Sequence, residues 1–195
     1  MLLNSFLYFA WLTITLPVVV WGLQELAAGC GKNGKHCISR PPDCLSDPKL
    51  CTQIATVTPA ASGVVHVHIK AKGSRLKNRW IGLGFSEDDN MGNDAVIVCF
   101  HNETTTAAEL SYNQDHFNLG SAGVDQKYLH PTKTKGEDDT IHCSLDLYKK
   151  LSVKEHEFDL SKPHYFLFSS GPLKTGRIAK HDKLPIVSIE PYVFP

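Results

Sequence analysis

The stretch from Trp80 to Cys99 constrains the fold more than any other part of this chain. It opens with alternating apolar residues, WIGLGF over 80–85, and closes on the apolar, β-branched run AVIVCF over 95–100. Such runs are typical of strands, and the polar residues between them indicate a loop. Gly82 and Gly84 fall inside the first run, where glycine marks a bulge or a close approach of another group. The stretch therefore predicts strand, loop, strand, with something bulky against the first strand.

Further strands are predicted on both sides of this stretch, wherever apolar or alternating residues stand between clusters of Gly, Pro, Asn, Asp or Lys. These segments are 64–71, 108–113, 141–147, 165–170 and 186–193. Residues 147–157 carry the one hint of helix, which we interpret as a helical turn in a crossover. The mixed charges of Lys133, Lys135 and 137–139 indicate a solvated loop. So many short strands predict an all-β fold, an antiparallel β-sandwich.

The first 28 residues differ from the rest of the chain. Residues 2–20 are mostly apolar and carry no charged side chain, and small residues follow at Gly22 and at 27–29. This pattern predicts a secretory signal peptide over 1–28 and a mature domain over 29–195. An uncleaved signal anchor is the alternative, because the apolar run is long and lacks a Lys or Arg before it. We expect a secreted protein with no membrane span after cleavage, since no second segment approaches that length.

Six cysteines fit the oxidising compartment that a secretory signal implies. Four of them recur every seven residues in a stretch rich in Gly, Pro and Lys: Cys30, Cys37, Cys44 and Cys51. We interpret this stretch as a disulfide-stapled N-terminal segment, whose pairing the sequence leaves open. Cys99 ends one predicted strand and Cys143 begins another, which makes them candidates for a cross-strand or inter-sheet bridge. A zinc site is the rival interpretation, disfavoured because no Cys-x-x-Cys pair is present.

One N-glycosylation sequon, Asn102-Glu103-Thr104, follows the strand that ends near Cys99. A polar loop after a strand is exposed, so we expect Asn102 to accept a glycan in the secretory pathway.

The net charge of the chain indicates no polyanionic partner, because acidic and basic residues number 20 each and the pI is near 7.1. We therefore expect no nucleic acid or anionic membrane surface as a partner.

Met91 stands in the polar loop between the strands predicted over 80–85 and 95–100. A methionine there is either an apolar plug over a core or a thioether ligand for a soft or haem metal. Among the ten histidines, His66 and His68 alternate along a strand, which we interpret as two solvent-facing rings rather than a chelate. His181 stands in a Gly/Lys-rich loop between apolar strands, an edge where a ligand pocket opens. Six more are expected at the surface: His101, His116, His130, His142, His156 and His164.

The residues WIGLGFS at 80–86, MGND at 91–94 and the strand ending at Cys99 resemble the signature of a DOMON domain. The similarity is to the ferric-chelate-reductase-1-like branch, and the Cys-rich segment from Cys30 and residues 158–172 agree with it. It spans about 30–190 and implies an immunoglobulin-like β-sandwich of DOMON type. Haem-binding members of the family hold one b-type haem between a methionine and a histidine. On that pattern Met91 and His181 are the axial ligands.

A Met/His pair closes the coordination of haem iron and raises its reduction potential, which favours single-electron transfer over oxygen chemistry. We expect apolar walls for the haem from aromatic residues: Trp80, Phe85, Tyr165, Phe166 and Phe168. Ferric reductase activity is not implied by the resemblance. Ferric-chelate-reductase-like proteins join their DOMON domain to a reeler domain and a membrane cytochrome b561 core, and neither is recognised in this sequence. We expect no autonomous enzyme, but a module that exchanges electrons with an unknown redox partner, linked to iron or other extracellular redox chemistry.

One candidate for that partner is a membrane cytochrome b561 protein. The alternative function needs no iron: the same sandwich would bind a sugar or another small ligand, or serve as an extracellular interaction module. Met91 and His181 discriminate between the two functions, because only the haem hypothesis requires both side chains to face one cavity.

Overall fold

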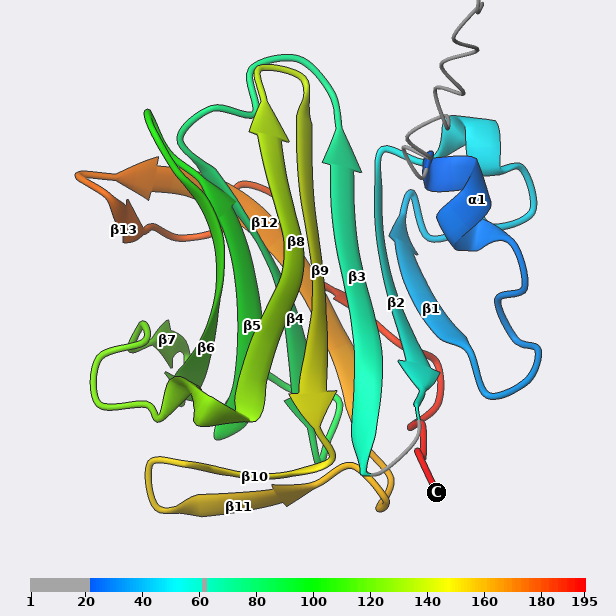
Figure 1. Ribbon diagram of the computed structural model, residues 1–195, viewed down its shortest axis with the longest axis vertical. Coiled ribbons are helices and arrows are strands. Elements are labelled where there is room, and N and C mark those ends of the chain that lie inside the picture. Colours follow the sequence, from blue (N-terminus) through cyan, green and yellow to red (C-terminus); the bar gives the residue numbers. More distant parts are fainter. Residues whose placement is uncertain (1–21, 61–62) are drawn as a thin grey trace, which may run out of the picture.

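The computed structural model describes residues 22–60 and 63–195 of the chain. Two antiparallel sheets face each other, which confirms the predicted all-β sandwich (Figure 1). In chain order the elements are α1 (Leu23–Ala27), β1 (His36–Arg40), η1 (Pro48–Leu50), β2 (Gln53–Pro59), β3 (Val64–Lys72), β4 (Arg79–Ser86), β5 (Asp94–His101), β6 (Thr106–Gln114), β7 (Phe117–Asn118), η2 (Gln126–Tyr128), β8 (Leu129–Glu137), β9 (Thr140–Tyr148), β10 (Lys150–Val153), β11 (His156–Asp159), β12 (Tyr165–Lys174), β13 (Arg177–Ile178) and β14 (Ile186–Val187).

The two sheets differ in the order of their strands. The first has the strand order β1-β2-β3-β9-β8. The second has the order β13-β12-β4-β5-β6-β7, with the short β14 paired to β12. A separate hairpin, β10-β11, lies across one end of the sandwich (Figure 1). Strands β4, β5 and β6 follow one another as an antiparallel meander, so the loops β4–β5 and β6–β7 meet at the same end of the sheet.

Strand β4 shows how the sequence builds the sandwich. Its odd-numbered residues Ile81, Leu83 and Phe85 belong to the main core and are fully or almost fully buried. Phe85 meets Phe166 of β12 edge to face, with 5.6 Å between ring centroids. Side chains alternate between the two faces of a strand, so the even-numbered residues of β4 lie on the outer face of the second sheet. The period-two pattern therefore gives this sheet one face for the core and one for a site.

Disulfides join the parts of the molecule as the sequence led us to expect. Cys99 of β5 and Cys143 of β9 form the inter-sheet bridge through the core, with Cα atoms 5.9 Å apart. The N-terminal cysteines pair with their neighbours along the chain, Cys30 with Cys37 and Cys44 with Cys51. The Cys44–Cys51 bridge packs with α1 and Ile54 as a second small apolar cluster. The described residues have no unpaired cysteine for a zinc site.

Two segments differ from their predicted structure. Residues 147–157 were expected to contain a helical turn, but they form the end of β9, strand β10 and the turn into β11. Leu151 and Val153 are buried on alternate positions, and a run this short fits both periods in sequence alone. Lys133, Lys135 and Glu137, expected in a loop, lie in β8. This strand is an edge of its sheet, where charged side chains discourage pairing with another chain.

The strands near the two ends of the chain also differ from those predicted. The strand expected over 186–193 is only two residues long, Ile186–Val187, followed by an isolated bridge between Tyr192 and His164. Pro191 lacks the N–H group that a continuous ladder would need. Strands β1 and β2 were not predicted, because β1 lies within the disulfide-rich stretch and β2 follows directly on it. The predicted signal peptide over 1–28 lies mainly outside the described residues, which begin at 22.

Candidate functional site

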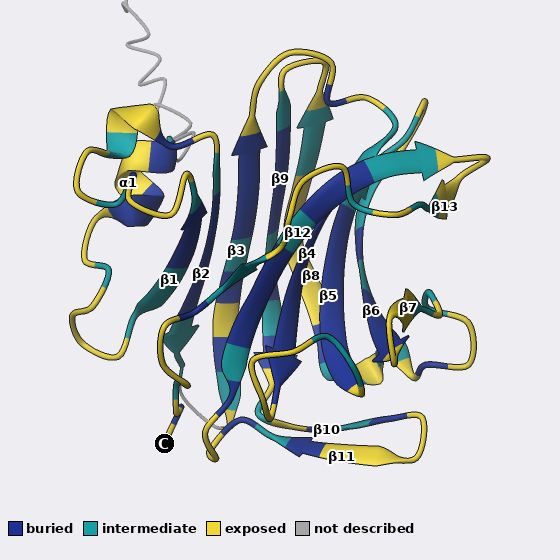
Figure 2. Cartoon of the chain, turned by 180° about the vertical axis from the view of Figure 1, so that it is seen from behind, coloured by how far each residue is buried: buried dark blue, intermediate teal, exposed yellow. Residues whose placement is uncertain are grey.

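A cavity of about 760 Å³ opens on the outer face of the second sheet, the face that Figure 2 presents. Its volume is in the range of sites for small molecules and cofactors. The floor comes from β4, β5 and β12: Trp80, Gly82, Gly84, Val96, Val98, Leu167 and Ser169. The surrounding walls come from three connecting segments, the loop β4–β5, the hairpin β6–β7 and the chain from β13 to β14. Both predicted ligands, Met91 and His181, line this one cavity.

Met91 enters the wall from the loop β4–β5, where the backbone is fixed on both sides of it. The N–H of Asn90 donates to the Asp88 carboxylate at 2.8 Å, and the N–H of Gly92 donates to Asp94 at 3.0 Å. Side chains of Asp and Asn that bond their own backbone in this way hold tight turns. Met91 itself is half-buried and flanked by these two turns. Its thioether is thus presented from a loop with a defined path.

Asp94 connects the Met91 loop to the neighbouring hairpin. Its carboxylate accepts from the side chain of Asn113 at 2.9 Å as well as from Gly92, and it is fully buried. Asn118 continues the network, donating to Asn113 at 3.0 Å and to Ser111 at 2.9 Å. Burial raises the pKa of the Asp94 carboxyl, while hydrogen bonds from Asn113, Ser86 and Gly92 oppose the shift. One buried carboxylate therefore couples two walls of the cavity.

His181 reaches the cavity from the segment between β13 and β14, which is anchored to the sheet. The indole Nε1 of Trp80 donates to the carbonyl of Ala179 at 3.1 Å. The N–H of Asp182 donates to the carbonyl of Ser170 at 3.3 Å. The Asp182 carboxylate also pairs with Arg79. Desolvation alone would raise the pKa of Asp182, but the hydrogen bond and charge of Arg79 lower it. His181 is thus held between two fixed neighbours.

Two glycines of β4 form part of the floor of the cavity. A Cβ atom on Gly82 would come within 3.3 Å of the Trp80 ring, and one on Gly84 within 3.3 Å of Leu167. The sequence pattern predicted a close approach of another group at these two glycines, and the structure shows them on the cavity side of β4. The missing side chains therefore let Trp80 and Leu167 pack closely on β4 and leave this part of the strand open to the cavity.

The aromatic residues expected to wall the cavity do so only in part. Trp80 lines it, but Phe85 lies on the opposite face of β4, inside the core, so Phe85 is corrected to a core residue. Phe166 and Phe168 are also fully buried in the core. Tyr165 is not among the residues that line the cavity. The walls are completed instead by aliphatic side chains, including Ile178 and Val187.

Sequence reasoning missed several residues of the site. His116, expected as a surface residue, lines the cavity from the hairpin β6–β7, together with Phe117 and Asn118. Lys180, next to His181, also lines it. The order of the strands could have placed His116 here, because alternate loops of an antiparallel meander lie at the same end and His116 follows the third strand. No local pattern in the sequence marks His116 or Lys180 as a cavity residue.

The remaining histidines form no metal centre. Within residues 22–60 and 63–195, no group of three or more His, Cys, Asp or Glu side chains is placed to hold a metal ion. His66 contacts Asp146 across β3 and β9, and the rings of His68 and His142 lie 6.0 Å apart. His142 and His164 are buried, contrary to the expectation of surface positions. Burial and the neighbouring Lys70 lower the pKa of His142 to about 4.

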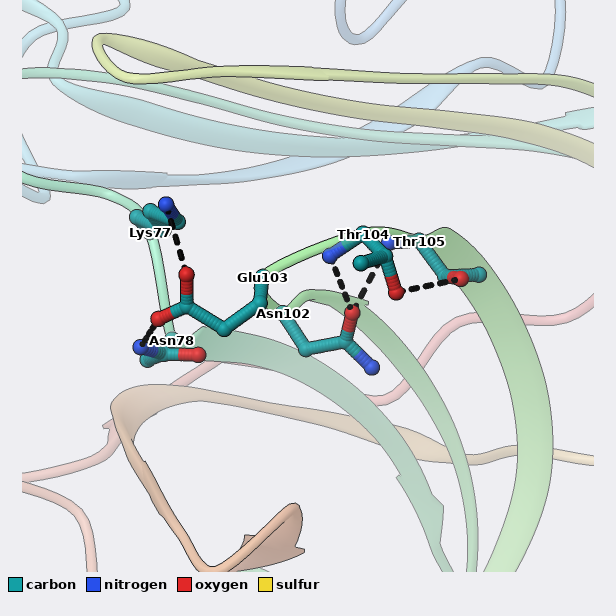
Figure 3. A network of polar contacts seen from close by, with 6 residues as sticks. All are labelled: Lys77, Asn78, Asn102, Glu103, Thr104 and Thr105. Carbon is teal, nitrogen blue, oxygen red and sulfur yellow. Dashed lines mark hydrogen bonds and ion pairs between the residues drawn. The ribbon is translucent and has the colours of Figure 1, made fainter.

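The sequon lies in the connection between β5 and β6 (Figure 3). The side-chain oxygen of Asn102 accepts from the backbone N–H groups of Thr104 and Thr105, at 2.9 and 2.8 Å. Glu103 points the other way and binds the ammonium of Lys77 and the amide of Asn78, both at 2.6 Å. The loop is therefore tied to the segment before β4, with the amide nitrogen of Asn102 directed away from these contacts (Figure 3).

Comparison with known proteins identifies the class to which this fold and site belong. The family model described as "DOMON domain" matches residues 60–171, so the chain belongs to the DOMON domain family. Human ferric-chelate reductase 1 is 26% identical over 183 residues, which cover 91% of this chain and 29% of that protein. The mouse DOMON domain-containing protein FRRS1L is 28% identical over 105 residues, covering 53% of this chain and 34% of that protein.

Among solved structures, the cytochrome domain of Myriococcum thermophilum cellobiose dehydrogenase has a similar fold. It matches with a TM-score of 0.55 over 72% of this chain and 74% of that domain, at 8% sequence identity. An identity this low establishes the fold alone. The chain spans about a third or less of the length of the curated relatives described above. Among the described residues, no helix has the length and apolar character needed to cross a bilayer.

Proposed function

We propose that this chain is a secreted, haem b-binding DOMON module that passes single electrons, with Met91 and His181 as the axial ligands of the iron. The observation that carries the proposal is the presence of both side chains in the lining of one cavity. They come from loops that are far apart in the chain, and each loop is anchored by its own hydrogen bonds. A thioether and an imidazole are the donor pair that a low-spin electron-transfer haem uses.

The residues around the cavity fit such a group. Gly82 and Gly84 lie on the cavity side of β4, and apolar side chains such as Val96, Val98 and Leu167 line the cavity beside them. An apolar shell with few polar groups is typical of cofactor sites. It also keeps water from the iron and favours the state of lower charge, which raises the reduction potential.

When bound, haem b supplies one-electron chemistry at its iron. The chain's own part is to hold and orient that group. Met91 and His181 would hold the iron through a thioether and an imidazole, a donor pair suited to one-electron transfer rather than to oxygen chemistry. Trp80 fixes the segment of His181 through Ala179, and Asp94 fixes the loop of Met91 through Gly92. The expected mechanism is therefore outer-sphere electron transfer with no change of ligands.

The cellular setting is part of the same proposal. A secretory signal over residues 1–28 would deliver the mature domain, 29–195, to a compartment where its three disulfides are stable. Ferric-chelate reductase 1 is similar to this chain over a fraction of its own length only. For this module we propose electron relay, and a membrane cytochrome b561 protein is the candidate redox partner.

Absorption spectroscopy of the purified secreted protein tests the proposal. Haem would be titrated into the wild type and into the variants Met91→Ala and His181→Ala, before and after reduction with dithionite. We expect a saturable one-to-one Soret change, sharp α and β bands on reduction, and loss of the low-spin spectrum in each variant. Val193→Ala, an exposed position outside the cavity, is the matched control and should keep the wild-type spectrum.

A folded wild-type protein that stays colourless at excess haem would contradict the proposal. The cavity would then belong to the alternative function, a haem-free module for a sugar or another small ligand. Near-wild-type low-spin spectra in both variants would instead show that haem binds with other ligands, and His116 would be the first residue to replace.

A further inference from the structure

We propose that Lys180 pairs with the acid groups of the bound ligand, so that the cavity selects an amphiphilic carboxylic acid and orients it. The inference rests on the proposed function, since haem b is such a molecule, with an apolar ring and two propionate groups. It adds a determinant of affinity and orientation to the two iron ligands.

The cavity lining carries one side chain of each charge sign, on different walls. Lys180 is the one Lys or Arg among its lining residues, and Asp89 is the one Asp or Glu. They belong to different walls: Lys180 to the segment between β13 and β14, and Asp89 to the loop β4–β5. The floor between them is formed mostly by apolar side chains and glycines. A ligand with acid groups at one end would be attracted to the wall of Lys180 and repelled from that of Asp89.

The ammonium group of Lys180 is available to a ligand. No ion pair engages its ammonium group among residues 22–60 and 63–195. The acidic residue next along the same segment, Asp182, is already paired with Arg79. Lys180 is exposed, and its long stem lets the ammonium group reach over the mouth of the cavity. The cation is therefore free to meet an incoming carboxylate.

The backbone on which Lys180 stands is fixed. On one side, the N–H of Ala179 donates to the carbonyl of Pro172 at 3.1 Å, and its carbonyl accepts from Trp80 at 3.1 Å. On the other side, the N–H of Asp182 donates to Ser170 at 3.3 Å. Lys180 and His181 lie between these anchors as neighbours in the chain. The backbone of Lys180 thus keeps a set place beside His181, and its flexible stem lets the ammonium group reach the acid groups of a ligand bound there.

A comparison of two ligands on one set of proteins tests the inference. Wild type, Lys180→Gln and Lys183→Gln would be titrated with protohaem and with its dimethyl ester, which keeps the ring and the iron but carries no acid group. An ion pair at an exposed site contributes up to about fivefold in affinity. We expect Lys180→Gln to bind the free acid about fivefold more weakly than wild type and the ester equally well. Lys183, which is exposed and lies outside the cavity lining, is the control and should change neither.

The possible outcomes separate this inference from the proposed function. If Lys180→Gln leaves both affinities unchanged, or weakens both by the same factor, the pairing with carboxylates is overturned while haem binding stands. A wild type that binds neither ligand overturns the proposed function and the inference together. Salt provides a further readout, because the preference for the acid over the ester should shrink with ionic strength in wild type and in Lys183→Gln, but not in Lys180→Gln.

Discussion

A Cβ atom on Gly171 of β12 would lie 3.0 Å from the Cα of His181 and 2.9 Å from the indole nitrogen of Trp80. Gly171 is buried, and its missing side chain is what allows the segment of His181 to pack directly on the sheet. Contacts below about 3 Å force one of the partners to move, and here the partners are a backbone and a rigid ring. Gly171 therefore determines where His181 stands.

The substitution Gly171→Ala tests this relationship. We expect it to displace His181, to weaken haem binding by about 10- to 100-fold, and to destabilise the fold by about 1–3 kcal/mol. Haem titration and chemical denaturation measure the two effects. Gly73→Ala is the control, because a Cβ atom there meets nothing within 4 Å. Wild-type affinity in Gly171→Ala would show that the position of His181 does not depend on this packing.

Two substitutions of Asp94 should separate the contribution of its hydrogen bonds from that of its charge to the stability of the Met91 loop. Asp94→Ala leaves the N–H of Gly92 and the amide of Asn113 without their buried acceptor, which costs about 1–3 kcal/mol. Asp94→Asn keeps an acceptor oxygen and should retain most of the stability and a low-spin haem spectrum. Urea denaturation and reduced-state spectra compare the two variants. Equal loss in both would mean that the charge of Asp94, rather than its hydrogen bonds, stabilises the loop.

Asn102 should carry a glycan when the chain passes through a eukaryotic secretory pathway. The mobility of the secreted protein on a gel should increase after treatment with an N-glycosidase. Asn102→Gln and Thr104→Ala should each abolish the shift, since both destroy the sequon. Thr105→Ala removes one hydroxyl of the same loop but preserves the sequon, so it should remain glycosylated. Absence of any shift in the wild-type protein would contradict the prediction.

His142 should make the protein less stable in mild acid. Its pKa is about 4 in the fold, lowered by burial and by Lys70, His68 and Lys133, against about 6.5 in an unfolded chain. Between these values the unfolded chain binds a proton that the folded chain does not, so stability falls as the pH drops from 6.5 to 4. The slope is limited to about 1.4 kcal/mol per pH unit. Denaturation at several pH values should show a smaller slope in His142→Gln than in wild type; identical slopes would contradict this role.

The fold could be predicted because its signals are local. The alternation over 80–85 and the β-branched run over 95–100 have a strict period, and both became strands. The pairing of Cys99 with Cys143 was accessible for a similar reason, since each stands at the end of a strong strand signal. Short or charged segments gave no such period, which is why β8 and β10 were assigned to a loop and a helical turn.

The candidate site was predictable only in part, because it depends on which face and which end each residue occupies. Trp80 and Phe85 are five positions apart in one strand, so alternation alone places them on opposite faces, and only Trp80 lines the cavity. His116 and Lys180 needed the strand order and the path of a long connection. Strand order and the path of that connection are determined by tertiary packing, which a pattern of a few neighbouring residues does not indicate.

X-ray absorption at the iron edge of the haem-loaded protein shows whether Met91 and His181 bind the haem iron in this cavity. We expect one sulfur scatterer and otherwise nitrogen scatterers around the iron in wild type, with the sulfur lost in Met91→Ala. His181→Ala should keep the sulfur and lose one nitrogen. A wild-type spectrum without sulfur would contradict the assignment of Met91, and with it the proposed Met/His ligation.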